Sequence, residues 1–297
     1  MRLIGIALCL LALQSLQACG DGAVQASPPA PELRIQRGLP VCQVAGQTLH
    51  GDLFQPPPGP HQRRALLFVH GGGWSAGSRL DYEPLARALA QHGYTGLSVD
   101  YRLAPTVRHP AHLEDVKCAL RWLRSQAAAW EVDPQQVAVI GGSAGAHLAG
   151  LLAYTAEDPR FEGQGEPRQG STRVAAAILH AGPHDLSVLE SLPADARGAV
   201  HALLGTASPS ASQLREASPV HYLRQGAVPT LILHGQSDPL VPLDQAHRLA
   251  AALAQVQASH QLIVIPGAGH ADFGTQPDTI GQALLTFLQT HLSAKPP

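Results

Sequence analysis

The sequence contains the pattern Gly-x-Ser-x-Gly twice, and this pattern is typical of a serine nucleophile presented on a tight turn between a strand and a helix. The two serines are Ser75 and Ser143. Ser143 follows the apolar, β-rich run 136–141 directly, and an apolar helical pattern begins at the next residue. Ser75 instead follows three glycines and lies several residues before any helical pattern. We therefore predict that Ser143 is the nucleophile.

A serine hydroxyl is a poor nucleophile at neutral pH, so it needs a general base, and the base needs a carboxylate to orient it. After a turn of this kind the expected chain order is Ser, then Asp or Glu, then His. His270 lies late in the chain, in the glycine-rich stretch that ends the apolar run 260–267. Asp238 follows the preceding apolar run, 229–235. These positions predict that Asp238 and His270 are the partners of the nucleophile.

Other acids and histidines compete for these two roles. Asp244 begins a helical pattern, and Asp185 lies where the segment 186–226 begins, so both are less well placed than Asp238. The chain has 16 histidines, and a single histidine is therefore uninformative without its position. His147 lies one turn into the helical pattern after Ser143, and we predict a structural role for it.

Short apolar runs alternate with longer helical patterns from residue 33 onward, and this alternation predicts the elements that position the site. Strands are expected at 33–38, 48–54, 65–70, 95–101, 136–141, 173–181, 229–235 and 260–267. Helices are expected at 82–92, 112–129, 144–154, 243–256 and 279–292. Such a pattern favours the α/β class, with a mostly parallel sheet covered by helices on both faces. One catalytic domain would span 33–297, and residues 186–226, which break the alternation, would form a small cap.

The N-terminus has the layout of a secretory signal over residues 1–18, with one early cation, an apolar run and small residues near the end. The apolar run is too short to span a bilayer as a permanent helix. The signal ends in Leu-Gln-Ala-Cys, which resembles the lipobox of bacterial lipoproteins and implies lipidation at Cys19.

An ordinary cleaved signal with an incidental cysteine is the alternative to a lipobox. Residues 19–32 would form a lipidated cysteine and a flexible tether, because they are rich in Gly, Ala and Pro. Residue 20 is Gly and not the Asp that favours inner-membrane retention. The expectation is an exported bacterial lipoprotein of the outer membrane or facing the periplasm, and otherwise a secreted or periplasmic protein.

Two further cysteines, Cys42 and Cys118, would lie in an oxidising compartment and could form one disulfide. Cys42 lies in the region of the expected early strands, whereas Cys118 lies inside a helical pattern. A bridge requires Cα atoms about 4.4–6.8 Å apart, and the sequence does not show that separation. The disulfide therefore stays an open alternative at this point.

A glycine run, His70-Gly71-Gly72-Gly73, follows the expected strand 65–70. Glycines without Cβ atoms let backbone N–H groups approach a substrate oxygen, as in the oxyanion loops of lipases and esterases. The sequence resembles the α/β-hydrolase fold, and more narrowly the hormone-sensitive-lipase-like and feruloyl/acetyl-xylan-esterase-like (BD-FAE-like) esterases, over roughly residues 40–292. The pieces that carry this resemblance are HGGGW (70–74), DYRLAP (100–105), HPAHLEDVKCALRWL (109–123), VAVIGGSAGAHLA (137–149), HGQSDPLVP (234–242) and GAGH (267–270).

The resemblance implies a role for each matching residue. Ser143 would be the nucleophile, His270 the general base and then acid, and Asp238 the orienting carboxylate. The oxyanion hole would be formed by the backbone N–H groups of Gly72, Gly73 and Ala144. Trp74 is expected to contact the substrate. The chain departs from these families after DYRLAP, where a Glu and an aromatic residue are frequent and residues 106–110 read TVRHP; a pocket wall is therefore expected to differ.

The composition restricts the classes of partner and function that the protein could have. Charged residues make up 14% of the chain, with 20 basic and 22 acidic residues and no basic run, which argues against nucleic acid as a partner. We expect a serine carboxylic-ester hydrolase that uses an acyl-enzyme intermediate and neither metal nor organic cofactor. Its substrates would be short-acyl or sugar (acetyl or feruloyl) esters, and the lipid anchor would be its contact with a membrane.

Two alternatives remain open at the level of the sequence. The same triad serves peptidases and amidases, because the fold and the triad do not determine the leaving group. A surface-tethered scaffold protein that has lost catalysis is the second. The sequence gives no indication of the oligomeric state.

Overall fold

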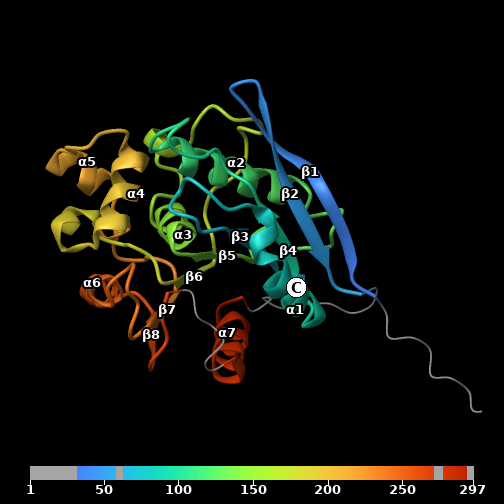
Figure 1. The fold of residues 1–297 in the computed structure, drawn as a ribbon. Helices are drawn as coiled ribbons and strands as arrows, with labels where there is room; N and C mark the ends of the chain where they lie inside the picture. Colours follow the sequence, from blue (N-terminus) through green and yellow to red (C-terminus); the bar gives the residue numbers. More distant parts are fainter. Residues whose placement is uncertain (1–31, 58–62, 271–276, 293–297) are drawn as a thin grey trace, which may run out of the picture. The chain divides into compact units, whose positions relative to one another are not determined.

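The centre of the fold is an eight-stranded sheet in the order β1-β2-β4-β3-β5-β6-β7-β8 (Figure 1). The structure, a computed structural model, describes residues 32–57, 63–270 and 277–292. Its strands are β1 (Arg34–Val44), β2 (Gln47–Gln55), β3 (Ala65–Val69), β4 (Thr95–Val99), β5 (Val137–Gly142), β6 (Ala176–His180), β7 (Thr230–Gly235) and β8 (His260–Ile265). The pairs β1–β2 and β2–β4 are antiparallel, and the other neighbours are parallel.

Helices cover both faces of this sheet (Figure 1). The α-helices are α1 (Glu83–Gln91), α2 (Ala111–Ser125), α3 (Ala144–Tyr154), α4 (Ala194–Leu204), α5 (Ala211–Glu216), α6 (Asp244–Gln255) and α7 (Pro277–His291). Short 3-10 helices are η1 (Arg79–Tyr82), η2 (Pro159–Phe161), η3 (Leu186–Ser191) and η4 (Pro219–Tyr222).

Side chains of the central strands alternate between the two faces, as strand geometry requires. On β3, Leu66 and Phe68 belong to one buried cluster, with side chains of α1 and α7. Leu67 and Val69 belong to the other, with side chains of α2 and α3. Both faces of β3 are therefore buried, which accounts for its uninterrupted apolar sequence. The mostly parallel sheet with helices on both faces confirms the predicted fold class.

The boundaries of several elements differ from those that the sequence predicts; for example, the helix expected at 112–129 spans Ala111–Ser125. The first strand does not end at residue 38 but continues to Val44, with shifts in its pairing to β2 after Gln36 and after Pro40. Gly38 lies inside the first irregularity and Pro40 is paired with His50 just before the second, so neither residue ends the strand. The strand expected at 173–181 is shorter and spans Ala176–His180. The segment 186–226 contains η3, α4, α5 and η4.

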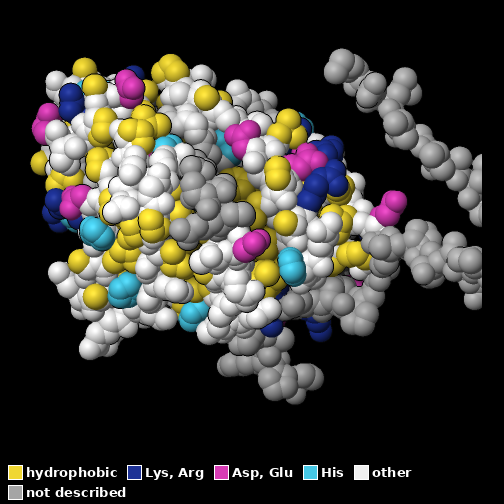
Figure 2. Space-filling model, turned by 60° about the horizontal axis from the view of Figure 1, so that its bottom comes forward, with side chains coloured by type: hydrophobic (Ala, Val, Ile, Leu, Met, Phe, Trp, Pro, Cys, Tyr) yellow, Lys and Arg dark blue, Asp and Glu magenta, His cyan; other side chains and the backbone are white. Residues whose placement is uncertain are grey.

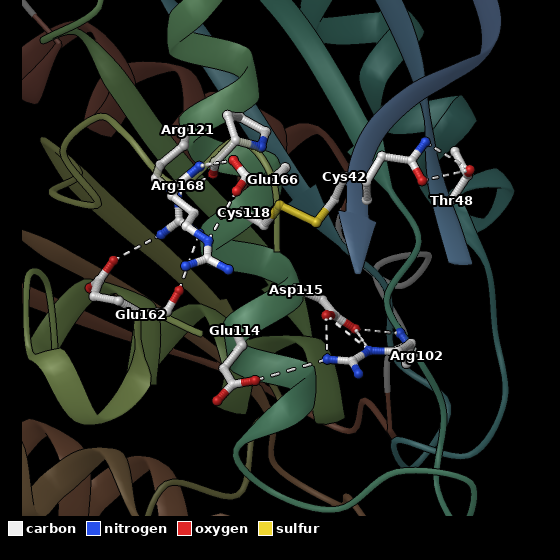
Figure 3. The surroundings of a disulfide bond; sticks show 12 residues. Cys42, Thr48, Arg102, Glu114, Asp115, Cys118, Arg121, Glu162, Glu166 and Arg168 are labelled. Carbon is white, nitrogen blue, oxygen red and sulfur yellow. Dashed lines mark hydrogen bonds and ion pairs between the residues drawn. A yellow bond between two sulfur atoms is a disulfide. The ribbon is translucent and has the colours of Figure 1, made fainter. Parts of the chain in front are cut away.

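A disulfide joins Cys42 of β1 to Cys118 of α2, with the Cα atoms 5.9 Å apart (Figure 3). Both cysteines are buried. Gly165 covers the bridge so closely that a Cβ atom there would lie 2.7 Å from Sγ of Cys42. One turn further along α2, Arg121 forms an ion pair with Glu162 at 2.9 Å. The sequence did not decide whether this disulfide forms. In the structure it links an edge strand to a helix that packs on the sheet.

The expected signal at 1–18, the expected lipidation site Cys19 and all but the last residue of the expected tether at 19–32 lie outside the described residues. Across the parts that the structure describes, we find no helix with the length and apolar character needed to cross a bilayer. Figure 2 shows one face of the molecule, where hydrophobic side chains are exposed among polar ones and Lys and Arg are few. This surface agrees with the low share of charged residues in the sequence.

Candidate active site

Ser143 lies on a sharp turn between β5 and α3, with φ 55° and ψ −122°. This conformation is rare for a residue with a side chain and marks a strained position. Two glycines permit the turn. A Cβ atom on Gly141 would lie 2.2 Å from the carbonyl oxygen of Gly145, and one on Gly145 would lie 2.0 Å from that of Val69. The Gly-x-Ser-x-Gly pattern is therefore a steric requirement of this turn.

His270 joins the serine to a carboxylate. Its Nε2 lies 2.9 Å from Oγ of Ser143, and its Nδ1 lies 2.7 Å from Oδ2 of Asp238. The carboxylate can only accept a hydrogen bond, so Nδ1–H donates to Asp238 and Nε2 is left to accept from the serine hydroxyl. The structure thus brings together Ser143, Asp238 and His270, which follow β5, β7 and β8 at the same edge of the sheet.

Asp238 is held in place by donors other than His270. Its Oδ1 accepts hydrogen bonds from the backbone N–H groups of Leu240 and Val241, both at 2.9 Å. Burial acts to raise the pKa of Asp238, but the hydrogen bonds from His270, Val241 and Leu240 outweigh it, and the pKa lies below its usual value. The carboxylate therefore stays ionised and can orient the imidazole.

The rival residues have other contacts. Asp244 begins α6 and pairs with Arg248, while Asp185 caps η3 and also contacts Arg248. Ser75 is exposed, and its N–H donates to the carbonyl of Gly72. Within the described ranges, none of these three forms a hydrogen bond or ion pair with His270.

Two backbone N–H groups are available next to the serine. Gly73 and Ala144 line the same cavity as Ser143 and His270. Neither N–H donates to another residue in the part of the chain that the structure describes. Ala144 is the first residue of α3, where N–H groups have no partner inside the helix. Both groups can therefore serve an anionic oxygen bound at Ser143.

Gly72, the third residue expected to contribute to the oxyanion hole, does not line the cavity. It lies in a tight turn with φ +96°, and its carbonyl accepts hydrogen bonds from the N–H groups of Ser75 and Ala76. A Cβ atom at Gly72 would lie 2.3 Å from the carbonyl oxygen of Ala76. This glycine thus shapes the loop that presents Gly73.

The cavity next to Ser143 has a volume of about 190 Å³. Its walls come from the loops after the strands and from the segment 186–226. Residues from that segment are Leu192, Asp195, Ala196, Ala199 and Val200. Sequence reasoning placed a cap here but did not identify these residues. The signal that could have found them is their spacing by three and four residues, which places them on one face of a helix.

Trp74 lines the cavity and is buried. Its indole Nε1–H donates to Nδ1 of His147 at 3.3 Å, and Nε2 of His147 lies 2.6 Å from the carbonyl oxygen of Ala217. Because an indole only donates and a carbonyl only accepts, His147 is neutral and carries its proton on Nε2. Burial lowers the pKa of His147 to about 3, which keeps the ring neutral. His147 thus connects the pocket wall to the segment 186–226.

Residues 52–253 match the family model described as BD-FAE. The chain is 36% identical to Esterase LipC of Mycobacterium tuberculosis over 239 residues, which are 77% of this chain and 59% of LipC. It is 31% identical to an ethyl acetate hydrolase of Pseudomonas putida, with 83% of this chain and 80% of the relative covered. Measured against LipC and two further mycobacterial esterases, LipM and LipQ, the chain spans between 53% and 59% of the relative's length.

Solved structures show the same similarity. Esterase 2 of Thermogutta terrifontis with bound butyrate superimposes with a TM-score of 0.73 at 28% identity, covering 91% of this chain and 97% of that one. The same esterase phosphonylated by sarin gives a TM-score of 0.75 at 26% identity, covering 92% and 99%. A truncated carbohydrate esterase from gut microbiota gives 0.74 at 23% identity, covering 82% and 90%, and this likeness concerns the fold alone.

Proposed function

Because the chain belongs to the BD-FAE family of α/β-hydrolase esterases, we propose that it is a serine carboxylic-ester hydrolase that works through an acyl-enzyme intermediate. The observation that carries this proposal is the unbroken line of contacts from Ser143 Oγ through His270 to Asp238, at 2.9 and 2.7 Å. The nucleophile, its base and the residue that orients the base are thus within hydrogen-bonding reach before substrate arrives.

The reaction would begin with attack of Ser143 Oγ on the ester carbonyl carbon while Nε2 of His270 takes the hydroxyl proton. Negative charge develops on the carbonyl oxygen and would be stabilised by the N–H groups of Gly73 and Ala144, with Gly72 shaping the loop. His270 then donates its proton to the departing alcohol, and Ser143 keeps the acyl group. Water, deprotonated by His270, attacks the acyl-enzyme and releases the carboxylic acid.

Short acyl groups would fit this site best. A cavity of about 190 Å³ has room for a small acyl group and part of an alcohol, and its walls include the side chains of Trp74, Leu192 and Val200. Relatives bear names that agree with such substrates: one is an ethyl acetate hydrolase, and a solved neighbour holds butyrate. We also propose sugar esters with acetyl or feruloyl groups as natural substrates, and these should be tested next.

The experiment is hydrolysis of p-nitrophenyl esters from acetate to palmitate by the protein from residue 20 onward. Ser143→Ala should lower kcat by about 10³-fold or more, because triad nucleophiles have effects of that size. Ser75→Ala is the matched control, since this serine has the same motif, is exposed and forms no hydrogen bond with His270 in the described structure, and the kcat of the variant should stay within about twofold of wild type. Rates should fall beyond short chains.

A fluorophosphonate probe separates the alternatives. Covalent labelling that is lost in Ser143→Ala and kept in Ser75→Ala supports the proposed nucleophile. A folded protein that hydrolyses no ester and takes no label would reject it in favour of a catalytically silent scaffold. Labelling without ester turnover would redirect the proposal to peptides and amides, which the same acyl-transfer chemistry can cleave.

We also propose that the mature protein is exported and anchored through lipidated Cys19. This proposal rests on the Leu-Gln-Ala-Cys sequence at residues 16–19 and the preceding signal pattern. Growth with labelled palmitate should label the wild-type protein in a bacterial host, whereas Cys19→Ser should be exported without label. Equal labelling of both would reject lipidation at this cysteine.

A further inference from the structure

Helix α4 turns one face toward the cavity at Ser143. With Leu192, which precedes the helix, the residues on this face are Asp195, Ala196, Ala199 and Val200. Their spacing by three and four residues is that of a helix that buries an apolar stripe. Asp195 breaks the stripe, because it is an acid at a position where the pattern calls for an apolar side chain. Among the described residues that line the cavity, His270 is the other one with an ionisable side chain.

Nothing in the described structure neutralises Asp195. Its side chain is exposed and has no ion pair or hydrogen bond with another described residue. Two nearby charged residues do have partners. Asp185 contacts Arg248, and Arg197, two residues after Asp195, donates to the carbonyl of Leu192 instead. Asp195 therefore lines the cavity as an acid whose charge no described side chain compensates.

We propose that Asp195 makes this site discriminate between esters by charge, favouring those with a positive group against α4 and disfavouring those with a negative one. This inference rests on the proposed ester hydrolysis and adds the class of substrate. An ammonium group next to Asp195 would be attracted, and a carboxylate or sulfonate there would be repelled. The neighbouring Ala196 and Ala199 have small side chains, which leaves space beside the carboxylate for such a substituent.

The effect is expected to be modest, because the carboxylate is exposed to water. Attraction between unit charges a few ångströms apart in a solvated cleft corresponds to roughly three- to tenfold in kcat/KM. It should weaken in concentrated salt, since the Debye length falls from about 10 Å at 0.1 M to about 3 Å at 1 M. Salt dependence thus distinguishes a charge effect from a change of shape.

A different account of Asp195 is that an acid in the first turn of α4 stabilises the helix through the helix dipole. That account predicts a change in stability on substitution but no change in substrate preference. Asp278 lies in the first turn of α7, outside the cavity lining, and provides a matched comparison. Asp278→Asn removes the same charge from an equivalent helix position.

The experiment compares kcat/KM for acetylthiocholine with its uncharged isostere 3,3-dimethylbutyl thioacetate, at low salt and at 0.5 M NaCl. A second pair places a quaternary ammonium or a tert-butyl group on the acyl side of a p-nitrophenyl ester. We expect wild type to prefer the cation by about three- to tenfold in at least one pair, and the responding pair identifies which half of the ester lies against α4. Asp195→Asn should abolish this preference, as should high salt, and Asp278→Asn should keep it.

The same preference in Asp195→Asn as in wild type would overturn the inference, and so would the absence of any preference in wild type. The uncharged esters are the internal reference for the proposed function. If they are hydrolysed in a manner that depends on Ser143, the esterase proposal stands whatever the charged esters do. If they are not hydrolysed by folded protein, the esterase proposal itself has failed.

Discussion

Two carboxylates in one short stretch of sequence, Asp238 and Asp244, differ in what they contact. Asp238 accepts a hydrogen bond from Nδ1 of His270 at 2.7 Å, and its side chain is fully buried. Asp244 pairs with Arg248 on the surface of α6, and more than half of its side chain is exposed. The first arrangement orients an imidazole, whereas an exposed ion pair of the second kind contributes little to stability.

Asp238→Asn should lower kcat for short esters by about 10³- to 10⁴-fold, because an amide can donate to Nδ1 and stabilise the wrong tautomer of His270. KM should change little, since Asp238 does not line the cavity. Asp244→Asn is the control, with kcat expected within about twofold of wild type. Steady-state kinetics on both variants decides the assignment. An equal loss in the two would show that Asp238 has no special role.

At the scale of elements, the turn from β5 into α3 depends on backbone atoms that nearly touch. A Cβ atom at Gly145 would lie 2.0 Å from the carbonyl oxygen of Val69, so β3 and the first turn of α3 approach too closely for any side chain. Gly198 of α4 is also a helical glycine, yet a Cβ atom there would meet nothing within 4 Å. The same substitution should therefore have opposite effects at these two positions.

Gly145→Ala should lower the free energy of unfolding by about 3 kcal/mol or prevent folding, because the backbone of β3 or α3 must move. Gly198→Ala should raise it by about 0.5–1 kcal/mol, since alanine restricts the unfolded chain and favours helix. Urea unfolding measures both values. A stable, fully active Gly145→Ala protein would contradict the close approach of β3 and α3.

At the scale of the whole molecule, the sequence predicts the order of elements better than the contacts between distant ones. Apolar periodicity identified the central strands, and the chain order Ser, Asp, His selected the three residues that the structure brings together. Spacing along the chain carries no information on the 5.9 Å between the Cα atoms of Cys42 and Cys118, because they are 76 residues apart. The spacing of residues 192–200 indicates one face of a helix, but it does not show which part of the molecule that face covers, so the sequence did not predict that α4 lines the cavity.

Several buried histidines make the stability of the whole fold depend on pH. Burial lowers the pKa of His112 and His147 to about 3 and that of His109 to about 4. In the unfolded chain each would have a pKa near 6.5. The unfolded state therefore binds more protons below pH 6.5, and these groups favour the folded state fully above pH 6.5 and progressively less as the pH falls toward 4.

We expect the free energy of unfolding to be nearly constant from pH 8 to 7 and to fall between pH 6 and 4.5. Each buried histidine contributes a slope of about 1.4 kcal/mol per pH unit, and at least two should act together. Urea titrations at closely spaced pH values give this slope. His147→Gln should reduce the slope by about 1.4 kcal/mol per pH unit, because one histidine fewer takes up a proton on unfolding. A flat profile down to pH 4.5 would mean that these imidazoles are not buried in neutral form.

The disulfide between Cys42 and Cys118 also separates the active-site residues into two covalently distinct parts of the chain. The bridge closes the backbone from residue 42 to residue 118 into a covalent ring, and this ring contains the glycine loop that presents Gly73. Ser143, Asp238 and His270 all lie on the open chain that leaves the ring at α2. A single cut in the backbone inside the ring would leave one covalently connected molecule, whereas a cut between α2 and Ser143 would leave the segment with the nucleophile, the acid and the base without a covalent link to the ring.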